Sequence, residues 1–390
     1  MRSIELFAGA GGLGLGVSRA GFVPAAVIEW NRYCCDTIRE NQDRQLEPVV
    51  HWPLIEGDVR LVDFTAIGNP IDFISGGPPC QPFSLGGKHL GQTDGRDMFP
   101  EAIRAVRELR PRAFVFENVK GLTRQSFANY FQYIQLQMGY PEVIRKKSED
   151  WQGHLARLEK HHTQGFSGGL QYRVVVRLLN AADYGVPQRR ERVFMVGFRS
   201  DLEVEWSFPK PTHSLDALLW SQWRNTDYWE RHEVAKKLRP ENDKAKMRAL
   251  RPLDPTLFKA WSTVRDVTAD LPDPEFHPRL AAQFQNHRFQ PGARSYAGHT
   301  GSPLDEPAKT LKAGDHGVPG GENMVLRPDG SLRYFSVRES ARLQTFPDEF
   351  IFHGSWTETM RQLGNAVPVD LAAIVANSVR AQLEGPKGGD

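Results

Sequence analysis

The sequence predicts an α/β protein built on a doubly wound, mostly parallel sheet, with a second, smaller, loop-rich domain. Short β-branched or apolar runs alternate with helical patterns through the first half of the chain, as in parallel sheets with crossover helices. Residues 199–335 instead combine many Pro, Gly, Trp and basic residues with little periodicity. The length of 390 residues, with 40% hydrophobic content, is sufficient for a large core and one further domain.

The strands of this sheet are predicted from short apolar runs, and the helices from periodic segments between them. The predicted strands cover 3–7, 25–29, 71–75, 113–117, 173–179 and 192–198, with 49–56 as a weaker candidate. The predicted helices cover 13–20, 32–41, 100–110, 126–138, 336–345 and 369–382. The main domain therefore comprises 1–198 and 336–390, and the second domain comprises 199–335.

One segment interrupts the regular alternation of the main domain. Residues 141–170 carry a charged, helix-like pattern that includes a His161–His162 pair and ends in a Gly-rich turn. Charge runs of this kind are usually solvated helix faces. We therefore expect an insertion that forms a surface helix.

Composition limits the partners and the compartment. A formal net charge of +2 is too mild to identify an anionic partner, although a local basic surface would suffice for nucleic acid. Cys34, Cys35 and Cys80 lack metal-site spacing, and the adjacent pair is poorly placed to form a disulfide, which favours a reducing compartment. The chain shows no leader-like start and no apolar run of membrane-spanning length. We expect a soluble cytoplasmic protein with no bound metal.

Ligands of open α/β sheets bind in the crevice beyond the carboxyl ends of the strands, and several candidate residues fall there. In chain order they are Phe7, Gly9 and Gly11 after the first strand, Glu29 at the end of the second, Asp58 after the weaker candidate, Pro78 and Cys80 after 71–75, and Glu117 at the end of 113–117. These separate elements therefore converge on one edge of the sheet.

The turn FAGAGG predicts an adenosine-containing cofactor. A Gly-rich turn between a strand and a helix lets a ligand approach the backbone closely, and an acidic residue about twenty positions later suits a ribose diol. Gly9, Gly11 and Glu29 fit this pattern. Trp30 is either a stacking partner for adenine or a core aromatic, and Asp58 is a candidate acceptor for the exocyclic amine. Because nicotinamide enzymes and plain tight turns share such glycines, the turn alone does not decide the cofactor.

Cys80 is a candidate nucleophile. It lies in SGGPPCQPFS, where Gly and Pro end the strand abruptly and place a small side chain at the edge of the sheet. A lone cysteine is usually a buried small hydrophobe. A cysteine in a polar loop at the mouth of a ligand crevice is a better nucleophile candidate. Glu117, in FVFENV, either projects from the neighbouring strand into the same crevice or caps a helix.

Basic residues gather in PQRRERVFMVG. Arg190 and Arg192 alternate along the chain, so we expect both to face one side. Such a pair is suited to clamping a phosphate or a polar base edge, or to a surface salt-bridge cluster. Asn365 lies in GNAVPV, a Gly/Pro turn before the last helix that is placed to close over a cofactor.

Taken in order, these segments resemble the motif series of the DNA cytosine-5 methyltransferases of bacterial restriction-modification systems. The segments are ELFAGAGG, VIEW, GDV, GGPPCQPFS, ENV, PQRRERVFMVG, ESARLQTFPDEF and GNAVPV, and they cover about 1–140, 171–198 and 336–384. The resemblance implies the Rossmann-like fold of S-adenosylmethionine-dependent methyltransferases. It also implies that 1–198 plus 336–390 is the catalytic domain and 199–335 the target-recognition domain.

The resemblance implies a role for each candidate residue. The catalytic residues would be Cys80 as the nucleophile, Glu117 as the acid that engages N3 and the exocyclic amine of cytosine, Arg192 at O2, and Arg190. The cofactor S-adenosyl-L-methionine would be bound by Phe7, Gly9, Gly11, Glu29, Trp30, Asp58, Pro78, Asn365 and Val367. DNA would be contacted by Gln81, Ser84 and Arg96 in the loop after Cys80, by Gln188, and by Arg294, Lys309 and Lys312 in the recognition domain.

The implied function is sequence-specific methylation of C5 of a flipped-out cytosine in duplex DNA, through a covalent Cys80–C6 intermediate. Double-stranded DNA and a cognate restriction endonuclease are the implied partners of a monomeric, nucleoid-associated enzyme. A DNA-binding protein without activity would be expected to lack a catalytic residue, and a nicotinamide dehydrogenase would leave PPCQPFS unused. An RNA methyltransferase is the closer alternative, against which the long segment 199–335 argues. Glu5 stands where the family often has Asp, and 141–170 is longer than the usual connection.

Overall fold

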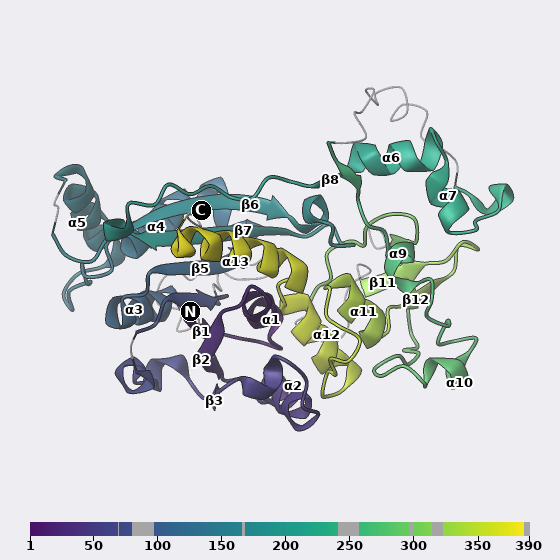
Figure 1. Cartoon of the computed structure of the whole chain (residues 1–390), viewed down its shortest axis with the longest axis horizontal. Helices are drawn as coiled ribbons and strands as arrows, with labels where there is room; N and C mark the ends of the chain where they lie inside the picture. The colour runs from purple at the N-terminus through teal and green to yellow at the C-terminus, as the bar shows by residue number, and fades with distance from the viewer. Residues whose placement is uncertain are drawn as a thin grey trace, which may run out of the picture.

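The computed structural model describes residues 1–68, 70–79, 97–165, 168–240, 257–295, 300–313 and 323–385 (Figure 1). Four of the predicted site residues lie outside these described residues: Cys80, Gln81, Ser84 and Arg96. All the other predicted site residues are among the described residues.

The centre of the molecule is a seven-stranded sheet in the order β3-β2-β1-β4-β5-β7-β6. Its strands are β1 Arg2–Leu6, β2 Val23–Glu29, β3 Leu54–Glu56, β4 Phe73–Gly76, β5 Ala113–Val119, β6 Tyr172–Asn180 and β7 Glu191–Arg199. The strands from β3 to β5 are parallel, whereas β7 runs antiparallel to both β5 and β6. The predicted doubly wound, mostly parallel sheet is therefore confirmed.

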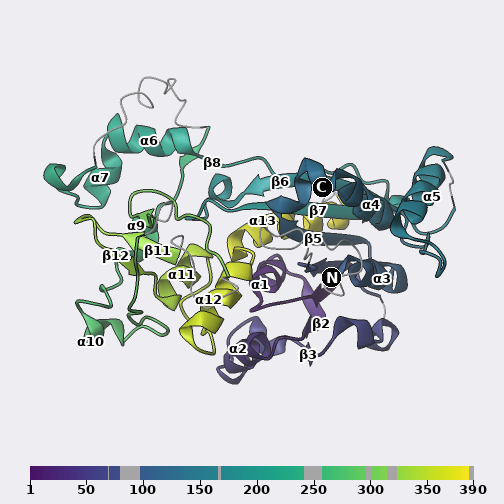
Figure 2. The same cartoon turned by 180° about the vertical axis from the view of Figure 1, so that it is seen from behind.

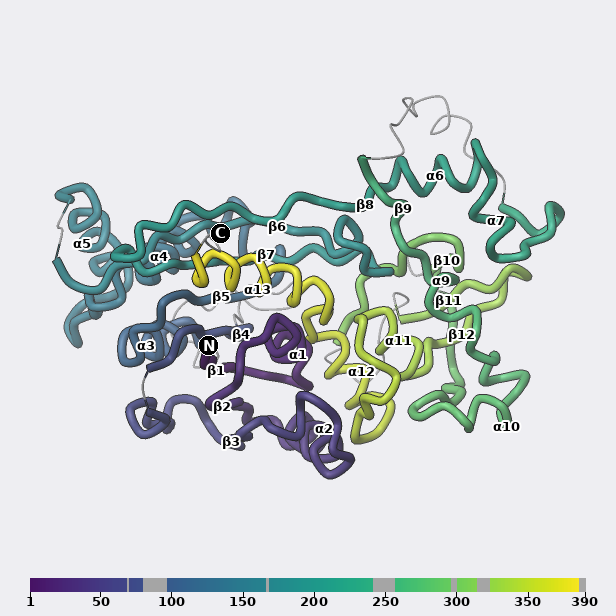
Figure 3. The backbone as a smooth tube through the Cα atoms, viewed as in Figure 1, coloured from purple at the N-terminus to yellow at the C-terminus, as the bar shows by residue number. Residues whose placement is uncertain are grey.

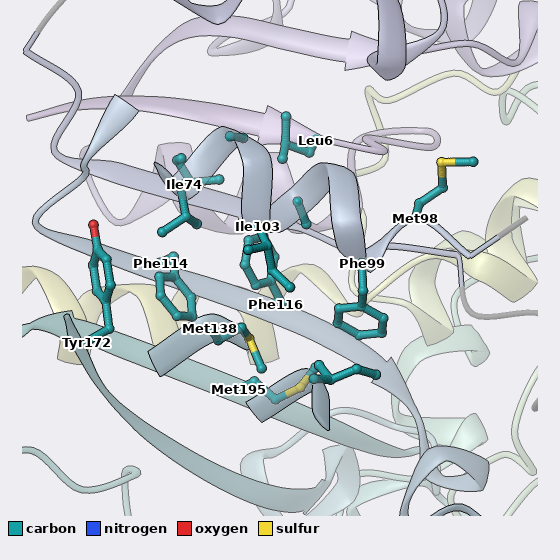
Figure 4. Close-up of a cluster of buried hydrophobic side chains, with 14 of the residues drawn as sticks. Leu6, Ile74, Met98, Phe99, Ile103, Phe114, Phe116, Met138, Tyr172 and Met195 are labelled. Atoms are coloured by element: carbon teal, nitrogen blue, oxygen red, sulfur yellow. The ribbon is translucent and has the colours of Figure 1, made fainter. Parts of the chain in front are cut away.

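Helices from residues 1–198 and 336–385 pack around this sheet on both faces. They are α1 Gly12–Arg19, α2 Arg32–Asp43, α3 Phe99–Leu109, α4 Ala128–Gly139, α5 Trp151–Thr163, α11 Val337–Leu343, α12 Trp356–Asn365 and α13 Val369–Glu384, of which α5 and α11 pack on other helices. Side chains alternate along β5, so Phe114 and Phe116 pack with α3 and α4 in the cluster of Figure 4, while Ala113 and Val115 pack with α1 and α13. Among the described helices, none combines the length and apolar content needed to cross a membrane.

The smaller region lies at one end of the molecule (Figures 1 and 2). Its short elements are β8 His213–Ser214, α6 Leu215–Trp223, α7 Asp227–Arg231, β9 Lys259–Ala260, α9 Val264–Thr268, α10 Pro278–Ala281, β10 Ser302–Pro303, β11 Met324–Leu326 and β12 Leu332–Tyr334. Loops dominate between them, as predicted. Figure 3 shows α11 between this region and α12. Leu343 of α11 packs with Val264 and Leu311, whereas Val337 and Ala341 of the same helix share a cluster with Leu15. This helix therefore belongs to the core of both regions.

Three elements differ from the predictions. Only Leu54–Glu56 of the candidate strand 49–56 is extended, because Val49–His51 forms a 3-10 turn. Helix α12 was not predicted. Helix α5 of the insertion is more than a solvated surface helix, since His154 and Leu158 are 1% and 0% exposed. Leu158 joins the hydrophobic cluster that contains α3 and α4, so the insertion packs on the main core.

Candidate active site

The Gly-rich turn between β1 and α1 is shaped by close packing. Gly11 has a φ of +92°, and a Cβ there would lie 2.7 Å from the ring of Trp52. A Cβ on Gly12 would lie 2.4 Å from the carbonyl oxygen of Val367. A Cβ on Gly9, by contrast, would meet no atom within 4 Å. The backbone of the turn is therefore closely packed against neighbouring residues at Gly11 and Gly12. At Gly9 it is open, so a ligand can approach the backbone closely there.

Glu29 ends β2 beside this open glycine. Its carboxylate accepts hydrogen bonds from the backbone N–H groups of Gly9 at 2.7 Å, Trp30 at 3.0 Å and Asn31 at 2.7 Å. Burial raises the pKa of Glu29, and the three bonds oppose that shift. The structure therefore brings together Gly9 and Glu29, the two parts of the predicted ribose site.

The other predicted cofactor residues differ in their solvent exposure and in the partners that their side chains already have. The Trp30 side chain is 67% exposed, which excludes the alternative of a core aromatic. Phe7 is half-buried with a φ of 56°, and Asn365 is exposed at the end of α12. The Asp58 carboxylate is engaged by Arg60, whose Nε lies 2.9 Å from Oδ2, and this bond lowers the pKa of Asp58. An adenine amine at Asp58 would therefore compete with the Arg60 guanidinium.

Glu5 is a buried carboxyl group beneath the Gly-rich turn. It lies on β1, is 3% exposed, and accepts a hydrogen bond from the Ser75 hydroxyl of the neighbouring strand β4. Its other oxygen, Oε1, has no hydrogen-bond partner among the described residues. Burial raises the pKa of Glu5 to about 8, and the Ser75 bond opposes the shift. Glu5 is therefore largely protonated at neutral pH.

We expect this raised pKa to make stability depend on pH. Between the unfolded pKa near 4.5 and the folded pKa of about 8, only the unfolded chain ionises Glu5, so stability is lost as pH rises. The unfolding free energy of the wild type should fall relative to that of Glu5→Gln by about 1 kcal/mol per pH unit in this window. Urea unfolding of both proteins at pH 5.5 and 7.5 measures this difference. A difference that does not change with pH would contradict the assignment.

The segment that leads to Cys80 is anchored by β5 and α3. Asn118 of β5 donates its Nδ2–H to the carbonyl oxygen of Pro78 at 2.9 Å. The backbone N–H of Met98 donates to the carbonyl oxygen of Pro79 at 3.1 Å. A Cβ on Gly77 would lie 3.4 Å from Oε2 of Glu117. The backbone just before Cys80 is therefore fixed beside the carboxyl group of Glu117.

Glu117 and Arg192 form a buried ion pair at this edge of the sheet. Phe194 of β7 is directly opposite Glu117, so Arg192, two residues earlier, lies on the same face. Arg192 Nε is 2.8 Å from Glu117 Oε1, and the side chains are 11% and 8% exposed. Despite this distance, Oε1 lacks a partner with hydrogen-bond geometry among the described residues. The two charged side chains are therefore held in direct contact beside the segment that leads to Cys80.

The pKa of Glu117 reflects opposing influences. Burial raises it, and the positive charges of Arg192 and Arg190 act in the other direction with a smaller effect. Burial likewise lowers the pKa of Arg192, and Glu117 opposes that shift. A carboxyl group with a raised pKa beside a cation is suited to donating a proton to a ligand as well as to accepting a hydrogen bond.

Arg190 and Gln188 are fully buried, which is a different setting from the predicted one. Arg190 donates to three carbonyl oxygens, those of Leu311 at 3.0 Å, Gly364 at 2.7 Å and Ala366 at 2.8 Å. Gln188 accepts the N–H of Leu311 at 3.0 Å and donates to Leu343. Arg190 therefore does not form one clamp with Arg192, and Gln188 has no exposed surface for DNA. Both side chains hydrogen-bond to Leu311 and so link the residues just before β7 to the segment around residue 311.

The basic residues predicted to read DNA lie in the smaller region. Arg294 and Lys312 are exposed. Lys309 is partly buried, and its Nζ donates to Thr300 Oγ1 at 2.8 Å. Residues 311–313 lie against the C-terminal end of α12, since a Cβ on Gly364 would be 2.3 Å from the backbone nitrogen of Ala313. This places the backbone of Lys312 near the predicted active site.

The chain matches the family model of the C-5 cytosine-specific DNA methylases over residues 1–140 and 167–381. The chain belongs to this family. The methylase therefore acts on DNA and transfers methyl groups to C5 of cytosine. The match leaves out 141–166, most of the segment predicted as an insertion.

Two relatives agree with this placement of the methylase, and a solved structure shares its fold. It is 32% identical over 384 residues to the Type II methyltransferase M.PspPI of Psychrobacter sp. (strain TA137), covering 96% of this chain and 78% of the relative. It is 31% identical over 387 residues to the Type II methyltransferase M.NgoMIV of Neisseria gonorrhoeae, covering 97% and 96%. The crystal structure of the S. pombe Dnmt2 methyltransferase has the same fold, with a TM-score of 0.56, 16% identity and 99% coverage of both chains.

Two structural roles in the methylase were missed by the sequence analysis. The ENV motif was recognised, but no role was assigned to Asn118, which binds the Pro78 carbonyl. The contact between Gly12 and the Val367 carbonyl was also missed, although both lie in recognised motifs. In each case the motif was visible in the sequence, whereas the backbone group that it contacts became visible only in the fold.

Proposed function

We propose that the methylase uses S-adenosyl-L-methionine to methylate a cytosine that is flipped out of duplex DNA and bonded through C6 to Cys80. The observation that carries this proposal is the buried Glu117–Arg192 pair beside the backbone of residues 77–79, the segment that leads directly into Cys80. An acid, a cation and the chain position of a nucleophile thus share one edge of the sheet. Cys80 itself lies outside the described residues.

The proposed mechanism makes C5 nucleophilic. The Cys80 thiolate attacks C6, which forms a C–S bond and moves the electron pair of the C5–C6 double bond toward N3. Glu117 supplies a proton to N3, and Arg192 donates a hydrogen bond to O2, so negative charge does not accumulate on the ring. C5 would then form a bond to the methyl group while the bond from that methyl to the sulfonium sulfur breaks, which leaves a neutral thioether. Glu117 takes back the N3 proton as the ring returns to its neutral form. Loss of the C5 proton and departure of the thiolate restore the double bond and release the product.

The target base must leave the stack for this attack. A cytosine inside a duplex does not expose C6 to a side chain, and flipping costs a few kcal/mol in lost stacking and pairing. We propose that the catalytic domain, 1–198 plus 336–390, binds the flipped base, with Gln81, Ser84 and Arg96 near the DNA. The region 199–335 is the proposed target-recognition domain, with Arg294, Lys309 and Lys312 as contacts to DNA.

The residues around the Gly-rich turn fit S-adenosylmethionine. Glu29 is a buried acceptor beside the open side of Gly9, and Trp30 presents an exposed ring next to it. We propose that Glu29 binds the ribose, that Trp30 stacks on the adenine, and that Phe7, Gly11, Asp58, Pro78, Asn365 and Val367 complete the site. When bound, this group supplies an electrophilic methyl on a sulfonium sulfur. The chain's own part is to orient that methyl group toward C5 and to exclude water.

Glu29→Ala is expected to weaken cofactor binding. The variant removes a charged acceptor proposed to bind two ribose hydroxyls. Because a hydrogen bond to a charged group contributes about 1.5–3 kcal/mol, we expect the affinity to fall about ten- to hundredfold. Isothermal titration with S-adenosylmethionine measures the change directly. Glu40→Ala, which removes an exposed carboxylate paired with Arg44 on α2, is the matched control. Equal affinities for the two variants would argue against the proposed site.

The biological setting is also a proposal. Curated relatives are named Type II methyltransferases, which supports a restriction-modification role with a cognate endonuclease that cleaves the same site. We propose a monomer that works in the cytoplasm on nucleoid DNA. Duplex DNA is favoured over RNA because the region 199–335 offers exposed basic residues such as Arg294 and Lys312 on loops, a composition suited to reading a groove.

The proposed function is tested by transfer of labelled methyl from S-adenosylmethionine to mixed-sequence duplex DNA, followed by mapping of the modified positions. We expect the label on C5 of cytosine within one short recurring sequence. A parallel reaction with structured RNA provides the competing substrate. Label on RNA with none on DNA would overturn the proposed substrate, and label scattered over unrelated cytosines would overturn sequence recognition.

A further inference from the structure

The insertion left out of the family match is in contact with the residues that anchor the catalytic segment. Trp151 and His154 are on α5, and α5 packs on α4, which carries Tyr130 and Tyr133. Trp151 contacts both tyrosines, with ring centroids 5.9 Å from each. The contact with Tyr130 is edge-to-face, a favourable geometry for aromatic rings. The insertion is therefore bound to α4 through a buried aromatic cluster.

A hydrogen-bonded histidine fixes this cluster further. His154 Nε2 is 2.6 Å from the carbonyl oxygen of Val143, and Nδ1 is 2.8 Å from the Tyr133 hydroxyl. Since a carbonyl only accepts, Nε2 carries the proton and the Tyr133 hydroxyl donates to Nδ1. Burial lowers the pKa of His154, which favours this neutral form. His154 therefore links the insertion to α4 through hydrogen bonds with defined donors and acceptors.

Tyr130 connects this cluster to the end of the catalytic segment. Its hydroxyl donates a hydrogen bond to Oδ2 of Asp97, the first described residue after the segment that contains Cys80. Oδ1 of Asp97 accepts the N–H of Phe99 at 3.2 Å, and the N–H of Met98 donates to Pro79 at 3.1 Å. Phe99 is in turn buried in the main core (Figure 4). The two ends of the segment that contains Cys80 therefore meet at an anchor formed by residues 97–99 and Pro79.

We propose that the insertion 141–166 is a positioning element for the methyl-transfer step. Trp151 and the Tyr133–His154 pair orient Tyr130. Tyr130 in turn holds Asp97, and with it residues 97–99 and Pro79, which flank the segment that contains Cys80. Tyr130 and Trp151 are positioning residues, since neither touches the reacting atoms. The proposal rests on the proposed role of Cys80. It predicts that a change in the insertion, on the far side of α4 from the sheet edge, alters the rate of the chemical step.

The test is the single-turnover rate of methyl transfer by Tyr130→Phe and Trp151→Leu. Small displacements of reacting groups are costly, so we expect each rate to fall about tenfold with unchanged affinity for S-adenosylmethionine. Trp151→Phe keeps an aromatic contact and should recover most of the rate. Tyr140→Phe is the matched control, because it removes the same hydroxyl from a Tyr–His pair, Tyr140 with His162 at 2.7 Å, that does not reach Asp97.

Hydrogen exchange gives a readout that does not depend on activity. Over a peptide spanning residues 97–103, Tyr130→Phe should exchange faster than the wild type, whereas Tyr140→Phe should not. Wild-type rates in Tyr130→Phe and Trp151→Leu, with Cys80→Ser inactive, would overturn this inference alone. Full turnover by Cys80→Ser would overturn the proposed function and this inference with it. A loss of thermal stability without a change in the single-turnover rate of folded protein would reduce the insertion to a purely structural role.

Discussion

Cys80→Ser is expected to lower methyl transfer by at least about a thousandfold while leaving cofactor binding intact. A serine hydroxyl ionises far less readily than a thiol, and the described residues beside this segment supply the Glu117 acid and the Arg192 cation rather than a base to activate it. The C–S bond to C6 would then not form, and C5 would stay a poor nucleophile. Single-turnover assays with labelled S-adenosylmethionine measure the loss.

The other cysteines provide the control for this variant. Cys34 and Cys35 are buried on α2, burial raises the pKa of Cys34 well above its usual range, and burial raises the pKa of Cys35 to about 12. Neither is a thiolate at neutral pH, so Cys34→Ser should keep the wild-type rate. Substantial activity in Cys80→Ser, or its loss in folded Cys34→Ser, would count against Cys80 as the nucleophile.

Glu117→Gln is expected to lower the turnover number by about a hundredfold or more. Glutamine has nearly the shape of glutamate and can still hydrogen-bond to the ring, but it cannot transfer a proton to N3. Burial keeps the pKa of Glu117 above its usual value despite Arg192, so the acid form persists to a higher pH than for an exposed carboxyl group. The rate of the wild type should therefore fall as pH rises through that pKa.

The pH profile separates proton transfer from simple loss of contact. In Glu117→Gln the alkaline fall assigned to Glu117 should disappear, leaving a lower and flatter profile over that range. Glu40→Gln, which changes an exposed carboxylate paired with Arg44, is the control and should keep the wild-type profile. An unchanged alkaline fall in Glu117→Gln would show that another group is responsible for it.

The parts of the site that follow from strand order could be predicted from sequence. Residues at the carboxyl ends of neighbouring parallel strands share one edge, and the sheet places β1 beside β2 and β4 beside β5. Glu29 therefore lies beside Gly9, and Glu117 beside the segment before Cys80. The motif series also led to the family that the comparisons show. These parts of the site depend on the strand order, which follows from the fold that the family resemblance implied.

The parts that depend on tertiary packing could not be predicted. Alternation along a strand indicates which way a side chain points but not what covers it, so the burial of Arg190 under Leu311 and Gly364 was not foreseen. The polar pattern of the insertion likewise concealed the burial of Leu158. For Trp30, the sequence left two alternatives open, and exposure at the end of β2 excluded one of them.

The most direct test of the covalent mechanism uses duplex DNA in which the target cytosine, once mapped, is replaced by 5-fluorocytosine. Fluorine cannot leave C5 as a cation, so the thiolate cannot depart after methyl transfer. With S-adenosylmethionine present, we predict an adduct that survives denaturation, and peptide mass spectrometry should place the methylated nucleotide on Cys80. Normal methylation of cytosine DNA without any adduct on the fluorinated duplex, or an adduct on another residue, would contradict the central claim.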